Sequence, residues 1–222
     1  MPVQIDIVSD VVCPWCFIGK RHLEQALAMY RQRHPEASAP EVRWHPFQLN
    51  PQLPAAGIPR AQYTAAKFGG PERAKEIYDR VAAAGARAGI AFAFDRIEMQ
   101  PNTIDAHRLM HRAGEVGIQD AMAESLFSGY FLEGRNFTDR TSLAELAQRA
   151  GMSAEDAKRY LDSDEDRALI AQQDEHARRI GVEGVPFFIF NQRLAVSGAQ
   201  PAEILADVME RSAVQTEAAA AQ

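Results

Sequence analysis

Alternating apolar and polar residues mark the start of the chain, and a helical spacing follows directly. Residues 3–8 alternate with β-branched side chains and predict a strand. Apolar residues then recur at helical spacing from Pro14 to the His34–Pro35 pair, and proline suits the first turn because its missing N–H would be unpaired there. Residues 42–45 alternate again, and Pro46 restricts this second strand to an edge or an end. The pattern predicts a β-α-β unit.

The middle of the chain, residues 58–180, changes to an almost wholly helical pattern. Gly70–Pro71 is typical of a helix start, and Asn102 is a candidate N-cap followed by Asp105. Three further helix starts are predicted from a serine followed three residues later by an acid: Ser142 with Glu145, Ser153 with Asp156, and Ser163 with Asp166. We therefore predict an inserted all-helical domain.

Strand-like patterns return after Gly181. Residues 187–190 and 194–196, separated by a turn at Asn191–Gln192, predict a β-hairpin, and Pro201 begins a last amphipathic helix. The predicted fold class is α/β, with residues 1–57 and 181–214 forming one domain around the insert at 58–180. The alanine-rich residues 215–222 are expected to be a flexible tail.

Composition excludes several classes of function. The chain has 222 residues, 46% of them hydrophobic, which is enough for a core. Its net charge is -6, and it lacks the stripe of basic residues with which proteins bind nucleic acids or acidic lipids. Its apolar runs are shorter than the roughly 18 residues of a membrane span. The N-terminus lacks the basic and apolar regions of a secretory signal peptide. We expect a cytoplasmic protein that binds neither nucleic acid nor membrane.

The only two cysteines of the chain, Cys13 and Cys16, form a C-x-x-C pair at the predicted start of the first helix. In a reducing compartment such a pair is more typical of redox chemistry or metal binding than of a structural disulfide, and zinc would need further ligands that no second pair supplies. A helix N-terminus lowers a thiol pKa, so Cys13 is the expected nucleophile. Cys16, one turn further along, is the expected resolving thiol.

Other groups near the cysteines leave alternatives open. Pro14 and Trp15 supply no positive charge, which predicts a reduction potential between those of strong reductants and strong oxidants. Trp15 either contacts substrate or covers Cys16. The nearest charged residues either assist proton transfer or form solvated surface, and we favour the surface: Asp6, Asp10 and Lys20.

Four sequence stretches together resemble a known family. They are residues 10–20 (DVVCPWCFIGK), residues 44–51 (WHPFQLNP), residues 101–103 with 106–109 (PNT and AHRL), and residues 181–188 (GVEGVPFF). With the predicted element order, they resemble the DsbA-like thioredoxin superfamily, and within it the intracellular FrnE-like dithiol-disulfide oxidoreductases. The resemblance covers essentially the whole chain.

This resemblance implies a thioredoxin-like fold with a helical insertion and a thiol-disulfide oxidoreductase or isomerase. It places a cis peptide bond at Val185–Pro186, beside the cysteines, and implies that Val185 binds an extended substrate through its backbone. The implied substrate-binding residues are Pro14, Trp15, Val185 and Pro186. Expected partners are protein or small-molecule thiols and disulfides, with no resident cofactor.

Glutathione-dependent enzymes provide an alternative. The 2-hydroxychromene-2-carboxylate isomerases and kappa-class glutathione transferases share this fold and the Asn-Thr…Ala-His-Arg pattern, but they use a serine where this chain has Cys13. Glutathione is therefore a candidate partner, through Val185 and the turn at residues 197–200. A binding protein with a vestigial C-x-x-C pair remains a third alternative.

A set of residues on one predicted helix face carries a weaker hypothesis. His107, His111 and Glu115 are spaced as metal ligands could be. They flank an apolar face without a recognisable polar pocket, so we favour a structural role and predict no metal site.

Overall fold

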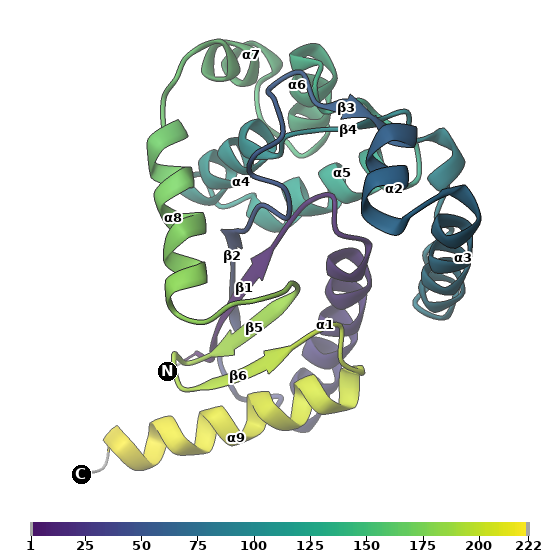
Figure 1. The fold of residues 1–222 in the computed structure, drawn as a ribbon. Helices are drawn as coiled ribbons and strands as arrows, with labels where there is room; N and C mark the ends of the chain where they lie inside the picture. The colour runs from purple at the N-terminus through teal and green to yellow at the C-terminus, as the bar shows by residue number, and fades with distance from the viewer. Residues whose placement is uncertain (1, 221–222) are drawn as a thin grey trace.

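A four-stranded mixed sheet lies at the centre of the protein (Figure 1), for which the computed structural model describes residues 2–220. The strand order is β2-β1-β5-β6, with β1 and β2 parallel and the other neighbours antiparallel. Its elements are β1 (Gln4–Ser9), α1 (Pro14–Arg33), β2 (Glu41–Pro46), β5 (Phe187–Phe190), β6 (Leu194–Ser197) and α9 (Ala202–Ala220). The predicted β-α-β and β-β-α units are therefore confirmed, and β2 is an edge strand that ends at Pro46, consistent with the predicted edge or end.

The main core lies between the sheet and the pair α1 and α9, which pack against each other, and continues into the insertion through α4, α5, α6 and α7. Ile5 and Ile7 of β1 point into this core together with Phe188 of β5, whereas Val8 lies in a second, smaller cluster on the opposite side. The period of two in β1 thus separates two apolar layers. This arrangement places the N-terminus of α1 at the end of β1.

Between β2 and β5 the chain forms the insertion, which lies above and beside the sheet in Figure 1. Its elements are β3 (Ile58–Pro59), α2 (Arg60–Phe68), α3 (Pro71–Arg87), the short 3-10 helix η1 (Phe94–Arg96), β4 (Met99–Gln100), α4 (Ile104–Glu115), α5 (Gln119–Phe131), α6 (Arg140–Arg149), α7 (Ala154–Asp162) and α8 (Arg167–Arg179). The helical prediction is confirmed except for β3 and β4, whose antiparallel pairing involves two residues in each strand. Two residues are too few to show the alternation of apolar and polar positions by which a strand is recognised in a sequence.

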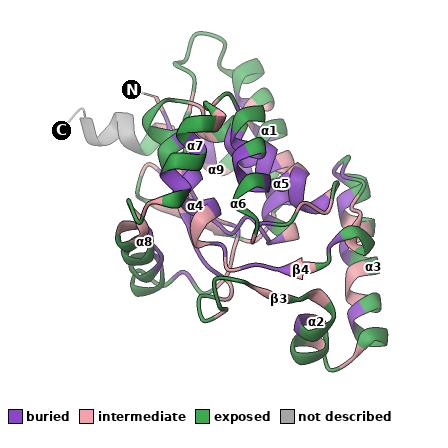
Figure 2. Cartoon of the chain, turned by 90° about the horizontal axis from the view of Figure 1, so that it is seen from above, coloured by how far each residue is buried: buried purple, intermediate pink, exposed green. Residues whose placement is uncertain are grey.

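Three helices of the insertion, α4, α5 and α8, pack against the edge strand β2. Figure 2 shows that buried residues concentrate in α5 and α1, while α2 and α3 are exposed along most of their length. Because α4 packs against β2, the parallel neighbour of β1, it lies close to the end of β1. The cysteine pair follows directly after that end.

The predicted helix starts differ in outcome. Ser153 is the N-cap of α7, and its hydroxyl accepts a hydrogen bond from the Asp156 amide at 3.3 Å, as expected. Asn102 lies one residue before the assigned N-cap of α4, and its side chain accepts from the Ile104 amide at 3.0 Å. The predicted chemistry of Asn102 is therefore present, displaced by one residue.

Two predicted starts are wrong. Ser142 lies inside α6 and is buried; Asp139 caps this helix instead, accepting from the Thr141 amide at 2.9 Å. Ser163 ends α7, and α8 begins at Arg167. A serine followed by an acid occurs inside and after helices as well, because its hydroxyl also satisfies turn and side-chain donors.

At the C-terminal end, α9 continues to Ala220, so the expected flexible tail is helical up to that residue, and residues 221 and 222 lie outside the described part. No helix within residues 2–220 is both long and apolar enough to cross a membrane.

Candidate active site

Cys13 is the N-cap residue of α1, and Pro14 occupies the first helical position. The Cys13 amide donates to the Asp10 carbonyl at 2.9 Å, and the Cys13 carbonyl accepts from the Cys16 amide at 3.0 Å. These backbone bonds hold the thiol at the positive end of a 20-residue helix. Cys13 is only 4% exposed, more buried than a freely accessible nucleophile, and it forms no disulfide with Cys16.

The loop before β5 closes the site from the other side. The Val185–Pro186 peptide bond is cis, as the family resemblance implies. The Cys13 Sγ atom donates a weak hydrogen bond to the Val185 carbonyl at 3.5 Å, so the thiol faces this loop. The Pro186 carbonyl in turn accepts from the Gly198 amide at 2.8 Å. Residues far apart in the sequence thus meet at the first turn of α1.

Gly19 makes this close approach possible. A Cβ atom at Gly19 would lie 2.9 Å from Cγ of Pro186 and 3.2 Å from Cζ of Phe188. The sequence analysis did not single out Gly19, although a glycine inside an amphipathic helix is a recognisable signal of close packing. It sets how near the Pro186 loop comes to α1.

Cys16 lies on the inner side of α1 and is 1% exposed. Burial raises the pKa of the Cys16 thiol well above its ordinary value, and the Cys13 side chain raises it further. The Ser9 hydroxyl and the Asp10 backbone amide act in the opposite direction and lower the pKa. The Cys16 thiol is therefore held in its protonated form, consistent with the predicted role of resolving thiol.

Trp15 lies between the cysteines and points outward, with 43% of its surface exposed. The exposed part of the ring is accessible to a substrate, and the remainder is covered by the protein, so contact with substrate and cover for Cys16 both stay predictions. A large exposed aromatic side chain next to a nucleophile is suited to contact an apolar substrate segment.

The expectation that the neighbouring charged residues form solvated surface is wrong for two of the three. Asp10 is fully buried, and its carboxylate accepts from the Leu49 amide at 2.7 Å. Lys20 is 3% exposed and forms ion pairs with Glu24, with Asp120 at 3.3 Å and with Glu124 at 3.1 Å, which link α1 to α5. Burial of these charges depends on the insertion packing over α1.

Asp6, the third of these residues, lies on the other face of β1. Its carboxylate is 2.7 Å from Nε2 of His45 on β2, and its side chain is 15% exposed. Asp6 lies inside β1, on the face that does not point into the main core, and no hydrogen bond or ion pair joins this pair to the cysteines within the described residues.

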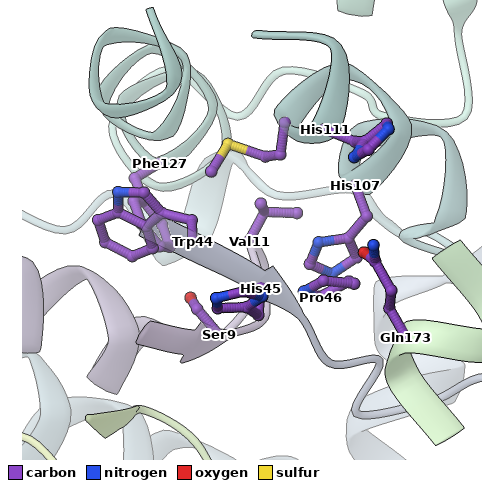
Figure 3. Close-up of a pocket in the computed structure, with 10 residues that line it drawn as sticks. Ser9, Val11, Trp44, His45, Pro46, His107, His111, Phe127 and Gln173 are labelled. Carbon is purple, nitrogen blue, oxygen red and sulfur yellow. The ribbon is translucent and has the colours of Figure 1, made fainter. Parts of the chain in front are cut away.

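The histidines of α4 border a small cavity, lined by both polar and apolar side chains, that the sequence analysis did not anticipate (Figure 3). His107 and His111 line it together with Ser9, His45 and Gln173, which corrects the expectation that no polar pocket exists beside them. Only the packing of α4 over the ends of β1 and β2 brings these residues together.

The three predicted metal-ligand candidates do not converge. His107 Nε2 lies 3.4 Å from Asp10, His111 Nε2 lies 4.0 Å from Asp166, and Glu115 pairs with Arg112 at 2.7 Å. Within the described residues, no group of three or more His, Cys, Asp or Glu side chains is placed to hold a metal ion.

Known proteins share this architecture over nearly the whole chain. Residues 4–210 match the model of the DSBA-like thioredoxin domain. The crystal structure of the probable DsbA oxidoreductase SCO1869 from Streptomyces coelicolor is 32% identical, covers 95% of this chain and 89% of that one, and superposes with a TM-score of 0.84. The uncharacterized protein YwbO from Bacillus subtilis is 27% identical over 90% of this chain and 92% of its own.

A more distant structure, the cytosolic disulfide reductase DsbM from Pseudomonas aeruginosa with GSH, shares the fold. It is 19% identical, covers 99% of this chain and 100% of that one, and has a TM-score of 0.62. The fold is therefore thioredoxin-like with a helical insertion, as predicted. With the family model matching residues 4–210, the chain belongs to the DSBA-like thioredoxin domain family, as an oxidoreductase that carries a C-x-x-C pair at Cys13 and Cys16.

Proposed function

We propose that the protein exchanges disulfides with thiol substrates through a mixed disulfide, with Cys13 attacking and Cys16 resolving. The observation that carries this proposal is the asymmetry of the two sulfurs: Cys13 Sγ faces the Val185 carbonyl at the helix N-terminus, whereas burial raises the pKa of Cys16. A thiolate is the nucleophile in such exchange, so the two positions suit the first and the second step respectively.

The reaction follows from this placement. The Cys13 thiolate attacks one sulfur of a substrate disulfide, and the other substrate sulfur leaves as a thiolate. Cys16 then attacks Cys13 Sγ, which forms the enzyme disulfide and releases the second substrate thiol. The enzyme dithiol is oxidised as the substrate disulfide is reduced, and the same steps in reverse oxidise a substrate dithiol.

We further propose that an extended substrate segment binds along the Val185–Pro186 loop. Within the described residues, no protein acceptor is within hydrogen-bond range of the Val185 amide, so this N–H is available to pair with a substrate carbonyl. The exposed ring of Trp15 lies on the same helical turn as Cys13 and offers an apolar contact to the substrate. Pro14, Trp15, Val185 and Pro186 would then form the substrate surface.

Glutathione is the small thiol that we propose as a partner, in a FrnE-like, cytoplasmic enzyme. The turn at residues 197–200 lies next to the cis proline, because the Gly198 amide donates to the Pro186 carbonyl at 2.8 Å. His22 of α1 approaches the same turn, with its Nδ1 atom 2.9 Å from the Gln200 carbonyl. The glutathione in the DsbM structure supports the choice of this thiol as a probe.

The proposal is tested with insulin reduction by a dithiol and with refolding of scrambled ribonuclease. We expect activity in the natural protein and its complete loss in Cys13→Ser, with unchanged circular dichroism. Equilibration of the cysteine pair in glutathione buffers gives the reduction potential and decides the physiological direction. Turnover of a chromene carboxylate with glutathione, retained in Cys16→Ser without any disulfide exchange, would instead favour the isomerase alternative.

A further inference from the structure

Two buried carboxylates bind neighbouring backbone amides in the post-β2 loop, residues 47–49. Among the residues that the structure describes, Asp10 and Asp174 are the only buried acids, at 0% and 6% exposure. Asp10 accepts from the Leu49 amide and Asp174 from the Gln48 amide, each at 2.7 Å. A buried carboxylate is costly unless it is hydrogen-bonded, so two of them on consecutive amides indicate a segment that is held in one place.

Arg178 completes the contact between α8 and the post-β2 loop. Its guanidinium donates to both oxygens of Asp174, at 3.2 Å from Nε and 3.1 Å from Nη2, and Nη2 also donates to the Gln48 carbonyl. The guanidinium carbon lies over the ring of Phe47, 4.1 Å from the ring centroid. The pair Asp174–Arg178 therefore binds both backbone groups of Gln48, the N–H and the C=O, as a neighbouring strand would.

The post-β2 loop is also tied to the turn that carries Cys13. The carboxylate of Asp10 binds the Leu49 amide, and the carbonyl of Asp10 accepts from the Cys13 amide at 2.9 Å. This connection does not involve α8. The loop therefore has two separate attachments, one to the Cys13 turn through Asp10 and one to α8 through Asp174 and Arg178.

The end of α8 leads into the Val185–Pro186 loop, which precedes β5 (Figure 1). The Val182 amide donates to the Ala177 carbonyl at 3.1 Å, which connects the helix to this loop. Val182 lies with Phe47 in the smaller apolar cluster. Leu49 and Val185 both pack against the same cluster. A shift of α8 relative to the post-β2 loop would therefore move the apolar support of Val185.

We propose, resting on the proposed function, that Asp174 and Arg178 are positioning residues that hold the Val185–Pro186 loop at the distance from Cys13 that an extended peptide disulfide needs. Among the described residues, neither forms a hydrogen bond with a cysteine, so they act through the post-β2 loop and not on the sulfurs. They fix the end of α8 to a segment that Asp10 ties to the Cys13 turn. A small disulfide, which needs only the sulfur of Cys13, should not depend on them.

The test compares a peptide disulfide, labelled with a fluorophore and a quencher on its two halves, with a nitrobenzoate disulfide whose thiolate product absorbs visible light. Each is mixed in excess with the reduced protein, and the single-turnover rate is followed over disulfide concentration. Asp174→Ala and Arg178→Met remove the two halves of the contact. We expect each to raise the half-saturating peptide concentration roughly fivefold, the scale of one net hydrogen bond. The limiting rate and the rate with the nitrobenzoate disulfide should stay unchanged.

The neighbouring residues of α8 supply matched controls. Glu175→Ala and Arg179→Met change exposed side chains that form no hydrogen bond or ion pair within the described part of the chain, and both variants should bind the peptide as the natural protein does. Asp174→Asn keeps an oxygen that can accept from the Gln48 amide, so it should bind the peptide more tightly than Asp174→Ala. Combining Asp174→Ala with Arg178→Met should add little to either change, because both side chains belong to one contact.

The outcomes separate the proposed function from the positioning role. A natural protein that reacts with neither disulfide contradicts the proposed function, and one that reacts only with the nitrobenzoate disulfide contradicts peptide binding and the positioning role with it. If both disulfides react but Asp174→Ala and Arg178→Met bind the peptide as the controls do, the positioning role is wrong and disulfide exchange stands. Equal losses with both disulfides overturn it as well. The Arg178 side chain is 41% exposed, so Arg178→Met decides alone should Asp174→Ala fail to fold.

Discussion

The two sides of the first turn of α1 are built in different ways. The outer side carries Cys13 and Trp15, and it faces the Val185–Pro186 loop. The inner side carries Cys16, which is enclosed by Ser9, Asp10 and the residues of the insertion behind them. The same helix thus directs the Cys13 sulfur to the Val185–Pro186 loop and buries the Cys16 sulfur, three positions further along.

Under the proposed function, this difference lets burial and backbone dipoles assign two identical side chains to two reaction steps. A nucleophile has to form a thiolate and reach the substrate, whereas a resolving thiol should stay protonated until the mixed disulfide forms next to it. The helix N-terminus favours the first property, and burial under the insertion favours the second.

The largest contrast is expected between the two serine variants. Cys16→Ser removes only the resolving thiol, so we expect it to accumulate a stable mixed disulfide with a substrate peptide, detectable by mass spectrometry. Cys13→Ser should form none under the same conditions. Equal amounts of adduct in the two variants would show that the assignment of roles is wrong.

A smaller effect, on stability, is expected from a substitution at Gly19, where α1 packs closely against Pro186. We expect Gly19→Ala to lower the free energy of unfolding by about 1–3 kcal/mol, because the new Cβ overpacks against Pro186. The same change in an unobstructed helix stabilises by roughly 1 kcal/mol. Gly184→Ala is the control, since its Cβ would meet no atom within 4 Å. Urea unfolding measures both, and a stabilised Gly19→Ala would contradict the close packing.

Because Cys16 is buried on the inner side of α1, we expect the stability of the reduced protein to depend on pH. Burial raises the pKa of Cys16 in the folded state, whereas the unfolded chain returns it to about 9.0. As pH rises above that value the unfolded chain loses the proton first, so the free energy of unfolding falls, by at most about 1.4 kcal/mol per pH unit. Cys16→Ala should show a flatter decline, and parallel curves would rule out this contribution.

The smallest effect on stability is expected at the outermost residue. Trp15→Ala should lower the free energy of unfolding by about 1 kcal/mol, because 43% of the residue is already exposed and only its covered part loses contacts. The exchange rate with a long peptide disulfide should fall several-fold, while that with a small disulfide should stay constant. Val116→Ala, at an exposed apolar residue beyond the end of α4, is the control. An equal loss for both substrates would indicate that Trp15 does not contact the peptide.

Prediction from the sequence succeeded where local pattern and chemistry coincide. Pro14 at the start of a helical spacing gave the position of α1, and the resemblance at residues 181–188 placed the cis proline beside the cysteines. It failed at Ser142 and Ser163, because a serine–acid pair is equally compatible with the inside or the end of a helix.

What the sequence by itself determined is the order of elements and the position of the two sulfurs on the first turn of a helix, because strand and helix periods and proline act over a few residues. The tertiary structure alone decided that Asp10 and Lys20 are buried and that Ser9, Trp44 and His107 share one cavity. Their proximity depends on the insertion folding back over the end of β1. Burial and electrostatic environment arise from contacts between distant segments, which no local pattern records.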